Sequence, residues 1–93
     1  MSLTPKERAR LKALAHSLKP VHHIGKEGVT EAGLTAIRDA FNHRELIKVK
    51  IRETSPQTAA EVGALVSAGL AGVEHVQTIG RTIVLFRPLP QNV

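Results

Sequence analysis

Apolar residues recur three or four positions apart in three stretches of the chain, the spacing that is typical of amphipathic helices. The first stretch follows Thr4-Pro5-Lys6-Glu7, which has the sequence of a capping box with proline at the first helical position. The second follows Thr30 and is predicted to end near His43, and the third is predicted to begin at Ser55-Pro56. The positions expected to face a core are Leu11, Leu14, Ala15 and Leu18; Leu34, Ile37, Ala40 and Phe41; and Val62, Leu65, Val66 and Leu70.

Four shorter stretches have the features of strands. Residues 21–24 are short and rich in β-branched side chains, and residues 46–52 alternate strictly between apolar and basic positions. Residues 74–79 and 82–87 flank Gly80-Arg81, a pair suited to a type II′ turn, and are therefore expected to form a hairpin. The last of these stretches is apolar at four consecutive positions, which favours an inner strand with the first helix covering its second face.

The order of elements is therefore αβαβαββ. Helices between successive strands indicate parallel βαβ crossovers, and the terminal hairpin adds an antiparallel pair. The predicted fold class is α/β, with a mixed four-stranded sheet packed with three helices. At 93 residues the chain has room for one domain, which we expect to span residues 1–93 with a core from about residue 3 to residue 88.

Composition narrows the class of protein further. Apolar residues make up 42% of the chain and charged residues 23%, as in ordinary globular proteins, and cysteine is absent, which excludes disulfides and thiolate metal ligands. The first twelve residues lack the apolar region of a secretory signal, and the longest apolar stretch has only about a dozen residues. We therefore expect a cytoplasmic protein with no membrane partner.

The charge of the chain is concentrated in its first half. The formal net charge is +5. Residues 1–52 hold eleven Lys or Arg and five acidic residues, whereas residues 53–93 hold two and three. A basic patch of this kind attracts polyanions such as nucleic acid, although a solvated surface with surplus lysines accounts for the charge equally well.

The segment Gly25-Lys26-Glu27-Gly28 lies between a predicted strand and a predicted helix. Two glycines three positions apart allow a tight turn and a close approach to a ligand, and Lys26 adds a donor for phosphate. The backbone N–H groups at the start of the following helix also favour phosphate, whereas Glu27 opposes it. A GXXG loop clamps the nucleic-acid backbone in KH domains, but a tight turn without a ligand explains the glycines as well.

The basic residues of the alternating strand, Lys48, Lys50 and Arg52, are expected to project together from the face opposite its apolar residues. They form either a binding surface for an anion or a solvated edge guarded by lysine. The five histidines are scattered, and His22 and His23 are expected to point to opposite faces of a strand, so we expect no metal site. A histidine beside the basic loop could instead contact RNA by stacking or hydrogen bonding. No arrangement of serine, histidine and acidic residues suggests an active site, so we expect no enzyme and no cofactor.

Taken in order along the chain, these segments resemble the CRM domain, the chloroplast RNA splicing and ribosome maturation family, and in particular its stand-alone bacterial YhbY-like members. The resemblance covers about residues 3–88. The matching segments are Leu14-Ala15-His16, Leu18-Lys19-Pro20-Val21, IGKEGVTE at 24–31, ELIKVK at 45–50 and VQTIGRTIVLFRP at 76–88.

This resemblance implies an α/β fold similar to the C-terminal domain of translation initiation factor three. It also implies RNA binding without catalysis or a small-molecule substrate, with precursor ribosomal RNA and the pre-ribosomal particle of the large subunit as partners. The implied RNA-binding residues are Gly25, Lys26, Glu27, Gly28, Lys48 and Lys50. We add Arg52 at the end of the basic strand, and Lys6, Arg10 and Lys12 of the first helix, as a wider footprint. The alternative is a protein-binding module whose basic surface docks an acidic ribosomal or assembly protein.

Overall fold

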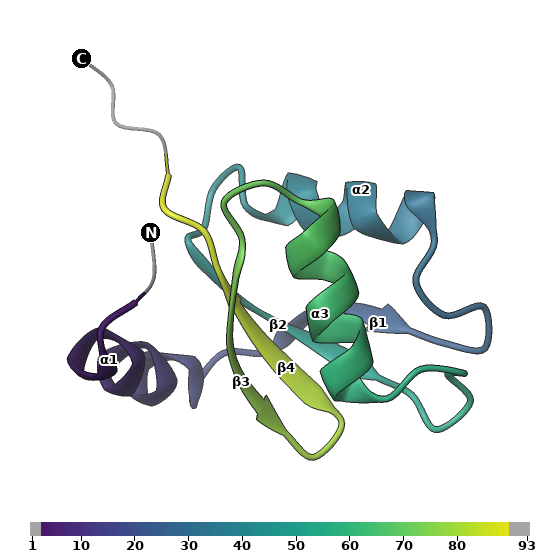
Figure 1. Cartoon of the computed structure of the whole chain (residues 1–93), viewed down its shortest axis with the longest axis horizontal. Helices are drawn as coiled ribbons and strands as arrows, with labels where there is room; N and C mark the ends of the chain where they lie inside the picture. The colour runs from purple at the N-terminus through teal and green to yellow at the C-terminus, as the bar shows by residue number, and fades with distance from the viewer. Residues whose placement is uncertain (1–2, 90–93) are drawn as a thin grey trace.

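Four strands form one mixed sheet with helices on both of its faces (Figure 1). The computed structural model describes residues 3–89. Along the chain the elements are α1 (Pro5–Ala15), β1 (Pro20–Ile24), α2 (Glu31–Ala40), β2 (Leu46–Ile51), α3 (Ala59–Gly69), β3 (Glu74–Ile79) and β4 (Thr82–Phe86). The predicted α/β class, the order αβαβαββ and the mixed four-stranded sheet with three helices are therefore confirmed.

The strands lie in the order β1-β2-β4-β3. β1 and β2 pair in parallel and are joined through α2, as the predicted βαβ crossover requires. The second crossover, through α3, does not join neighbouring strands, because β4 lies between β2 and β3 and pairs with both in antiparallel fashion. This position explains the apolar sequence of β4: Ile83, Val84 and Leu85 are all fully buried, so an inner strand was the correct prediction.

The predicted helix start is correct for α1 and wrong for α3. The predicted capping box of α1 is present, with Thr4 and Glu7 exchanging bonds of 3.0 and 3.1 Å, and these bonds from Thr4 lower the pKa of Glu7. α3 begins at Ala59 rather than at Ser55-Pro56. The Ser55 hydroxyl instead accepts a bond from the Gln57 N–H and closes a turn, and a second capping box begins at Thr58.

One other helix boundary also differs from the prediction. α2 ends at Ala40, three residues before the expected end at His43. α1 ends at Ala15, and the N–H of its C-cap residue His16 bonds back to the Ala13 carbonyl at 3.3 Å in a tightened last turn.

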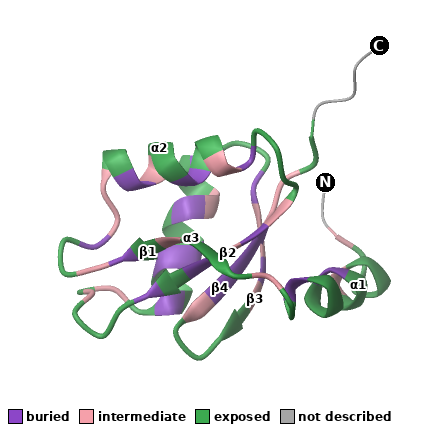
Figure 2. Cartoon of the chain, turned by 180° about the vertical axis from the view of Figure 1, so that it is seen from behind, coloured by how far each residue is buried: buried purple, intermediate pink, exposed green. Residues whose placement is uncertain are grey.

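The core has two parts, one on each face of the sheet (Figure 2). The larger part lies between the sheet and helices α2 and α3, and includes Ile47, Val49 and Ile51 of β2. The smaller part lies where α1 crosses one end of the other face, and there Leu11 and Ala15 meet side chains of β3 and β4. The first helix thus covers the second face of β4, as expected, but only at one end.

Two positions that were expected to face the core are exposed, Leu65 of α3 at 44% and Leu14 of α1, and the short contact between α1 and the sheet explains the second. Leu14 was expected to lie in the apolar stripe of α1, but its side chain is 52% exposed. Only the line through Leu11 and Ala15 meets the sheet, because α1 crosses its end rather than lying along it. α1 is fixed in addition by Arg8, whose guanidinium donates to the His75 and Val76 carbonyls at 3.2 Å, at an irregularity in the β3 ladder.

The hairpin turn has the predicted geometry. Gly80 has φ +57° and Arg81 has no positive φ, as a type II′ turn requires of its first and second central residues. No helix among residues 3–89 combines the length and the apolar character needed to cross a membrane.

Candidate nucleic-acid interface

Three loops meet at the end of the sheet that lies farthest from α1 (Figure 1). They are residues 25–28 after β1, residues 52–58 after β2 and the hairpin turn at residues 80–81. Parallel strands end at the same edge of a sheet, and β4 begins there because it runs antiparallel to β2. We call this edge, with its three loops, the loop end.

The segment 25–28 forms a tight turn at the loop end. The Gly28 N–H donates to the Gly25 carbonyl at 2.9 Å, and Gly28 has φ +68°. Lys26 and Glu27 have no positive φ, which is the pattern of a type I turn with glycine in its last position. Within residues 3–89 the N–H groups of Lys26 and Glu27 donate to no protein acceptor, and both side chains are exposed. The turn therefore offers two backbone donors and one ammonium group to a ligand.

The two glycines of this turn have different roles. A Cβ on Gly28 would collide with the Gln57 amide, whose oxygen also accepts the Val29 N–H at 3.1 Å, so the fold itself requires glycine there. A Cβ on Gly25 would meet nothing within 4 Å, and its backbone conformation does not require glycine. The fold therefore gives no reason for glycine at position 25, whereas the close approach of a ligand would.

The start of α2 contributes less to the site than the sequence suggested. Its N-cap Thr30 accepts the Gly33 N–H at 3.0 Å, and the Val29 N–H is held by Gln57. Two of the donors around the start of α2 are thus already bonded within the protein, whereas the N–H groups of Lys26 and Glu27 in the turn have no acceptor among residues 3–89.

The basic residues of β2 divide into two kinds. Lys48 and Lys50 lie on the face opposite the larger core, as the alternation predicted, and exposed Arg52 directly follows the last residue of the strand. Lys48 is partly buried and its Nζ donates to the His16 carbonyl at the end of α1, at 3.4 Å. Lys50 and Arg52 are exposed and, within residues 3–89, form no ion pair. The loop end therefore carries free cations, whereas Lys48 also helps to hold α1.

A groove of about 690 Å³ opens beside these residues, between β1, β2 and the hairpin turn. It is lined by His23, Lys50, Ile51, Arg52, Glu53, Thr54 and Arg81. His23 pairs in register with Lys50, so both side chains lie on the same open face of the sheet. Arg81 reaches the groove from the turn, and its Nη1 lies 2.9 Å from the Glu53 carboxylate. The groove thus combines cationic groups, one imidazole and one carboxylate that already has a partner.

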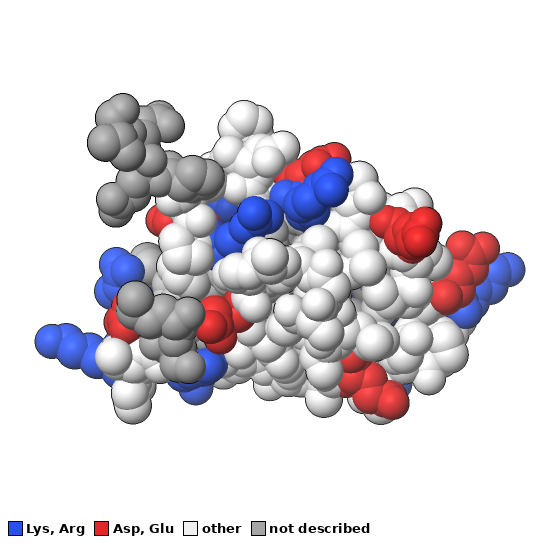
Figure 3. Space-filling view, turned by 45° about the horizontal axis from the view of Figure 1, so that its top comes forward, with Lys and Arg blue, Asp and Glu red and all other residues white. Residues whose placement is uncertain are grey.

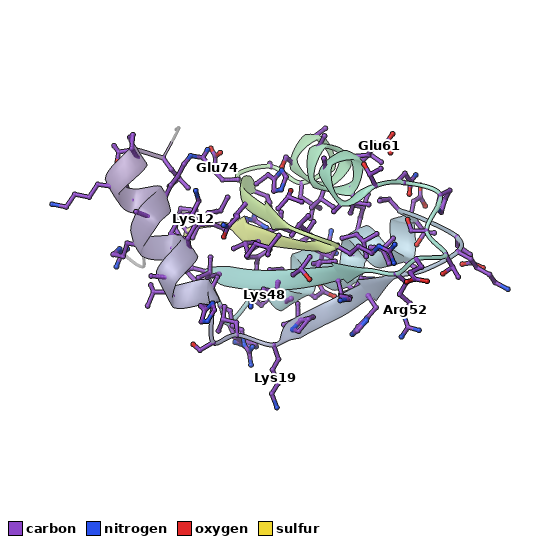
Figure 4. The ribbon with its side chains drawn as sticks, turned by 90° about the horizontal axis from the view of Figure 1, so that it is seen from below. Lys12, Lys19, Lys48, Arg52, Glu61 and Glu74 are labelled. Carbon is purple, nitrogen blue, oxygen red and sulfur yellow. The ribbon has the colours of Figure 1, made fainter. Side chains whose placement is uncertain are left out.

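The predicted cations of α1 lie far from this groove. Lys6, Arg10 and Lys12 are exposed on α1, at the opposite end of the sheet from Arg52, with Lys48 between the two regions (Figure 4). The structure thus does not bring the whole predicted set together. It places the turn 25–28, Lys50 and Arg52 at the loop end and the helix cations at the other.

The face that carries α2 and α3 has no comparable patch. Acidic and basic side chains are interspersed there around a broad uncharged area (Figure 3). Two histidines pack toward this side: burial lowers the pKa of His75, and burial followed by the neighbouring His23 lowers the pKa of His22. Among residues 3–89, no three His, Cys, Asp or Glu side chains lie close enough to one another to hold a metal ion.

Comparison with known proteins identifies the family of this chain. The sequence model of the CRS1/YhbY (CRM) domain matches residues 3–87. The chain belongs to the CRS1/YhbY (CRM) domain family. It is 43% identical over 88 residues to a protein of Haemophilus influenzae named RNA-binding protein, covering 94% of this chain and 87% of that one. It is 36% identical over 90 residues to the probable RNA-binding protein YqeI of Bacillus subtilis, covering 97% and 93%.

A solved structure has the same fold as this CRM domain. The solution structure of a hypothetical protein from Staphylococcus aureus, described as a candidate for RNA binding, superposes with a TM-score of 0.81 at 35% identity. The match covers 99% of this chain and 95% of that one. The resemblance stated from the sequence motifs is therefore confirmed at the level of the family.

Two residues of the CRM domain's groove were missing from the sequence-based set. His23 was considered as a metal ligand and, as a histidine beside the basic loop, as an RNA contact, but was not included in the set, and Arg81 was considered only as part of a turn. The alternation of β1 against β2 could have placed His23 beside Lys50, because parallel pairing puts equivalent positions on one face. No local signal places Arg81 beside Glu53, since their contact depends on the antiparallel pairing of β2 with β4.

Proposed function

We propose that this protein binds RNA through the loop end of its sheet, without catalysis, and acts in the assembly of the large ribosomal subunit by binding precursor ribosomal RNA. In this proposal the turn 25–28 receives the RNA backbone, with Lys26 and the free N–H groups on phosphate oxygens. Lys50 and Arg52 extend the contact, and Lys6, Arg10 and Lys12 add long-range attraction at the far end. The names of the relatives from Haemophilus influenzae and Bacillus subtilis support RNA as the ligand.

The observation that carries the proposal is the contrast between the glycines of the turn. Gly28 is required by its positive φ and by the Gln57 side chain, whereas no contact within the protein requires Gly25 to lack a side chain. This open position lies next to exposed Lys26 and near the exposed cations of β2. A polyanion can therefore approach the backbone closely at a point where donors and positive charge are available.

The role in ribosome assembly follows from the family resemblance and not from the geometry of the site. In this proposal the protein acts in the cytoplasm, with pre-ribosomal particles as its partners. Sedimentation of a native lysate tests this role: the protein should migrate with precursors of the large subunit and leave those fractions after nuclease treatment. Co-migration that survives nuclease would instead favour docking of the basic surface on an acidic protein.

Lys26 offers the direct test of RNA binding by the turn. Lys26→Ala should weaken binding of a structured ribosomal RNA fragment and lower the slope of log affinity against log salt by about one. Arg38→Ala is the matched control, because it also removes one exposed cation but lies on α2, away from the loop end. Equal affinities and slopes for the two variants would refute the assignment of the turn.

A further inference from the structure

The groove beside the turn contains more than phosphate-binding charge. His23 comes from β1, Lys50 and Arg52 come from β2 and its end, and Arg81 comes from the hairpin turn. Four side chains that can contact a nucleotide thus converge from three elements on a space of about 690 Å³. A volume of this size is within the range of pockets that bind small molecules, about 300–1,000 Å³.

We infer that this groove binds an unpaired nucleotide of the RNA, with its phosphate on Lys50 and Arg52 and its base against the His23 ring or the Arg81 guanidinium. The inference rests on the proposed function and specifies its ligand: RNA with a single-stranded segment next to the part that the turn 25–28 contacts. It adds His23 and Arg81 to the binding surface.

The shape of the site favours a single strand over a duplex. The groove lies between residues 52–54 on one side and the hairpin turn on the other. A paired base is stacked inside its helix, whereas an unpaired base can be splayed out and enter a groove. Proteins recognise such bases by stacking them on aromatic rings, histidine included, or on the guanidinium planes of arginine.

His23 is important for base stacking because the chain has few other aromatic residues. The only two aromatic residues apart from histidine, Phe41 and Phe86, belong to the packed clusters on the two faces, so neither can form the stacking platform of a typical RNA-binding sheet. On the open face, His23 is exposed and lies beside Lys50. It is therefore the one ring that lines the groove.

Glu53 pairs with Arg81 at the edge of the groove. Its carboxylate lies 2.9 Å from Arg81 Nη1, and the Arg81 carbonyl accepts the Ile51 N–H at 2.6 Å. Arg81 is thus held at the edge of the groove by both its side chain and its backbone. Both members of the ion pair are more than half exposed, so an RNA phosphate can compete for Arg81 at small cost.

The test compares two RNAs that differ only in an unpaired segment. Fluorescence anisotropy would measure the affinity of the full chain for a blunt RNA duplex and for the same duplex with a single-stranded overhang of about six nucleotides. The wild-type protein should prefer the overhang by about fivefold or more. His23→Ala and Arg81→Ala should reduce this preference, whereas His23→Phe, which keeps a ring, should retain it.

Arg38→Ala serves as the charge control, and circular dichroism would verify that each variant is folded. Equal binding of both RNAs by the wild type, or an unchanged preference in His23→Ala, would overturn the inference. Loss of the preference in His23→Phe would overturn the stacking role.

Lys26→Ala distinguishes a failure of this inference from a failure of the proposed function. If Lys26→Ala weakens both RNAs while His23→Ala behaves as wild type, only the groove is wrong. If Lys26→Ala weakens neither, the turn assignment fails as well.

Discussion

The two ends of the open sheet face use basic residues in different ways. At the α1 end, Arg8 donates to two carbonyls of β3 and Lys48 donates to the last turn of α1, so these cations fasten the helix to the sheet. At the loop end, Lys26, Lys50 and Arg52 are exposed and form no ion pair within residues 3–89. Like charges that lie near one another without a partner favour an anionic ligand, whereas those already bonded to carbonyls contribute to the fold.

This difference shows why the number of cations is a poor guide to a binding surface. Arg8 and Lys26 carry the same charge, and both lie in the basic first half of the chain. They differ in their partners: Arg8 donates to carbonyls of β3 and stabilises α1, whereas Lys26 forms no ion pair within residues 3–89 and is available to a ligand. The following predictions test that separation.

The largest expected effect is on RNA affinity. Removing the three free cations in Lys26→Ala/Lys50→Ala/Arg52→Ala should weaken binding by about 100-fold, because three charge-assisted phosphate contacts are lost. The matched triple variant Lys6→Ala/Arg10→Ala/Lys12→Ala removes equal charge from α1 and should weaken binding by less than about tenfold, through long-range attraction alone. Filter binding at fixed salt measures both. Equal losses would mean that net charge, and not the loop end, determines affinity.

The glycines of the turn should separate stability from binding. Gly28→Ala should lower the free energy of unfolding by about 1–3 kcal/mol, because alanine is strained at positive φ and its Cβ would displace Gln57. Gly25→Ala should leave stability unchanged or raise it by up to about 1 kcal/mol, while it weakens RNA binding. Urea denaturation and an affinity measurement on each variant provide the data. A destabilised Gly25→Ala protein would indicate that this glycine serves the fold.

Arg8 should show the opposite behaviour. Arg8→Met keeps an apolar stem but removes both bonds to β3, and should lower the free energy of unfolding by about 1–2 kcal/mol with little change in the RNA affinity of the folded protein. Arg10→Met, an exposed change on the same helix, should alter stability by less than about 0.5 kcal/mol. Chemical denaturation of the two variants decides whether Arg8 fastens α1.

A smaller effect is expected from pH. Burial lowers the folded-state pKa of His75, whose ring lies against Gly63 of α3 and bonds to the Thr78 hydroxyl at 2.8 Å. As the pH falls, His75 therefore takes up a proton at a higher pH in the unfolded chain than in the folded protein. The stability that depends on neutral His75 is thus present above about pH 6.5 and is lost as the pH falls toward the lower pKa of the folded state. Because the ring is partly exposed, the loss should be less than about 1 kcal/mol. Urea melts at pH 7.5 and 5.5 should show it, and His75→Gln should reduce it.

Local signals made most of the fold predictable. The capping box at Thr4, the alternation of β2 and the Gly80-Arg81 turn each depend on a few neighbouring residues, and each has the structure expected. The start of α3 was misplaced because Ser55 and Thr58 are both possible caps, and only Thr58 has a glutamate three positions later. The exposure of Leu14 could not be predicted, since it depends on the angle at which α1 crosses the sheet.

Individual residues of the candidate site could be predicted from the sequence, but not which of them lie together in the structure. The turn 25–28 and the basic residues Lys48, Lys50 and Arg52 were noticed from their spacing, but their contact with RNA was inferred only through the family resemblance and remains a proposal. The hydrogen bond of Lys48 to α1 and the ion pair of Arg81 with Glu53 join residues 32 or 28 positions apart. Such contacts follow from strand order and helix placement, so periodicity along the chain contains no signal for them.

The most direct test of the central claim is an amide chemical-shift titration of the full chain with a structured RNA. The account predicts that the largest changes occur at the loop end, in residues 25–28 and 50–54 and at Arg81, with smaller changes along α1. Changes concentrated on α1, or on the outer surface of α2 and α3, would contradict the account and place the RNA on another part of the molecule.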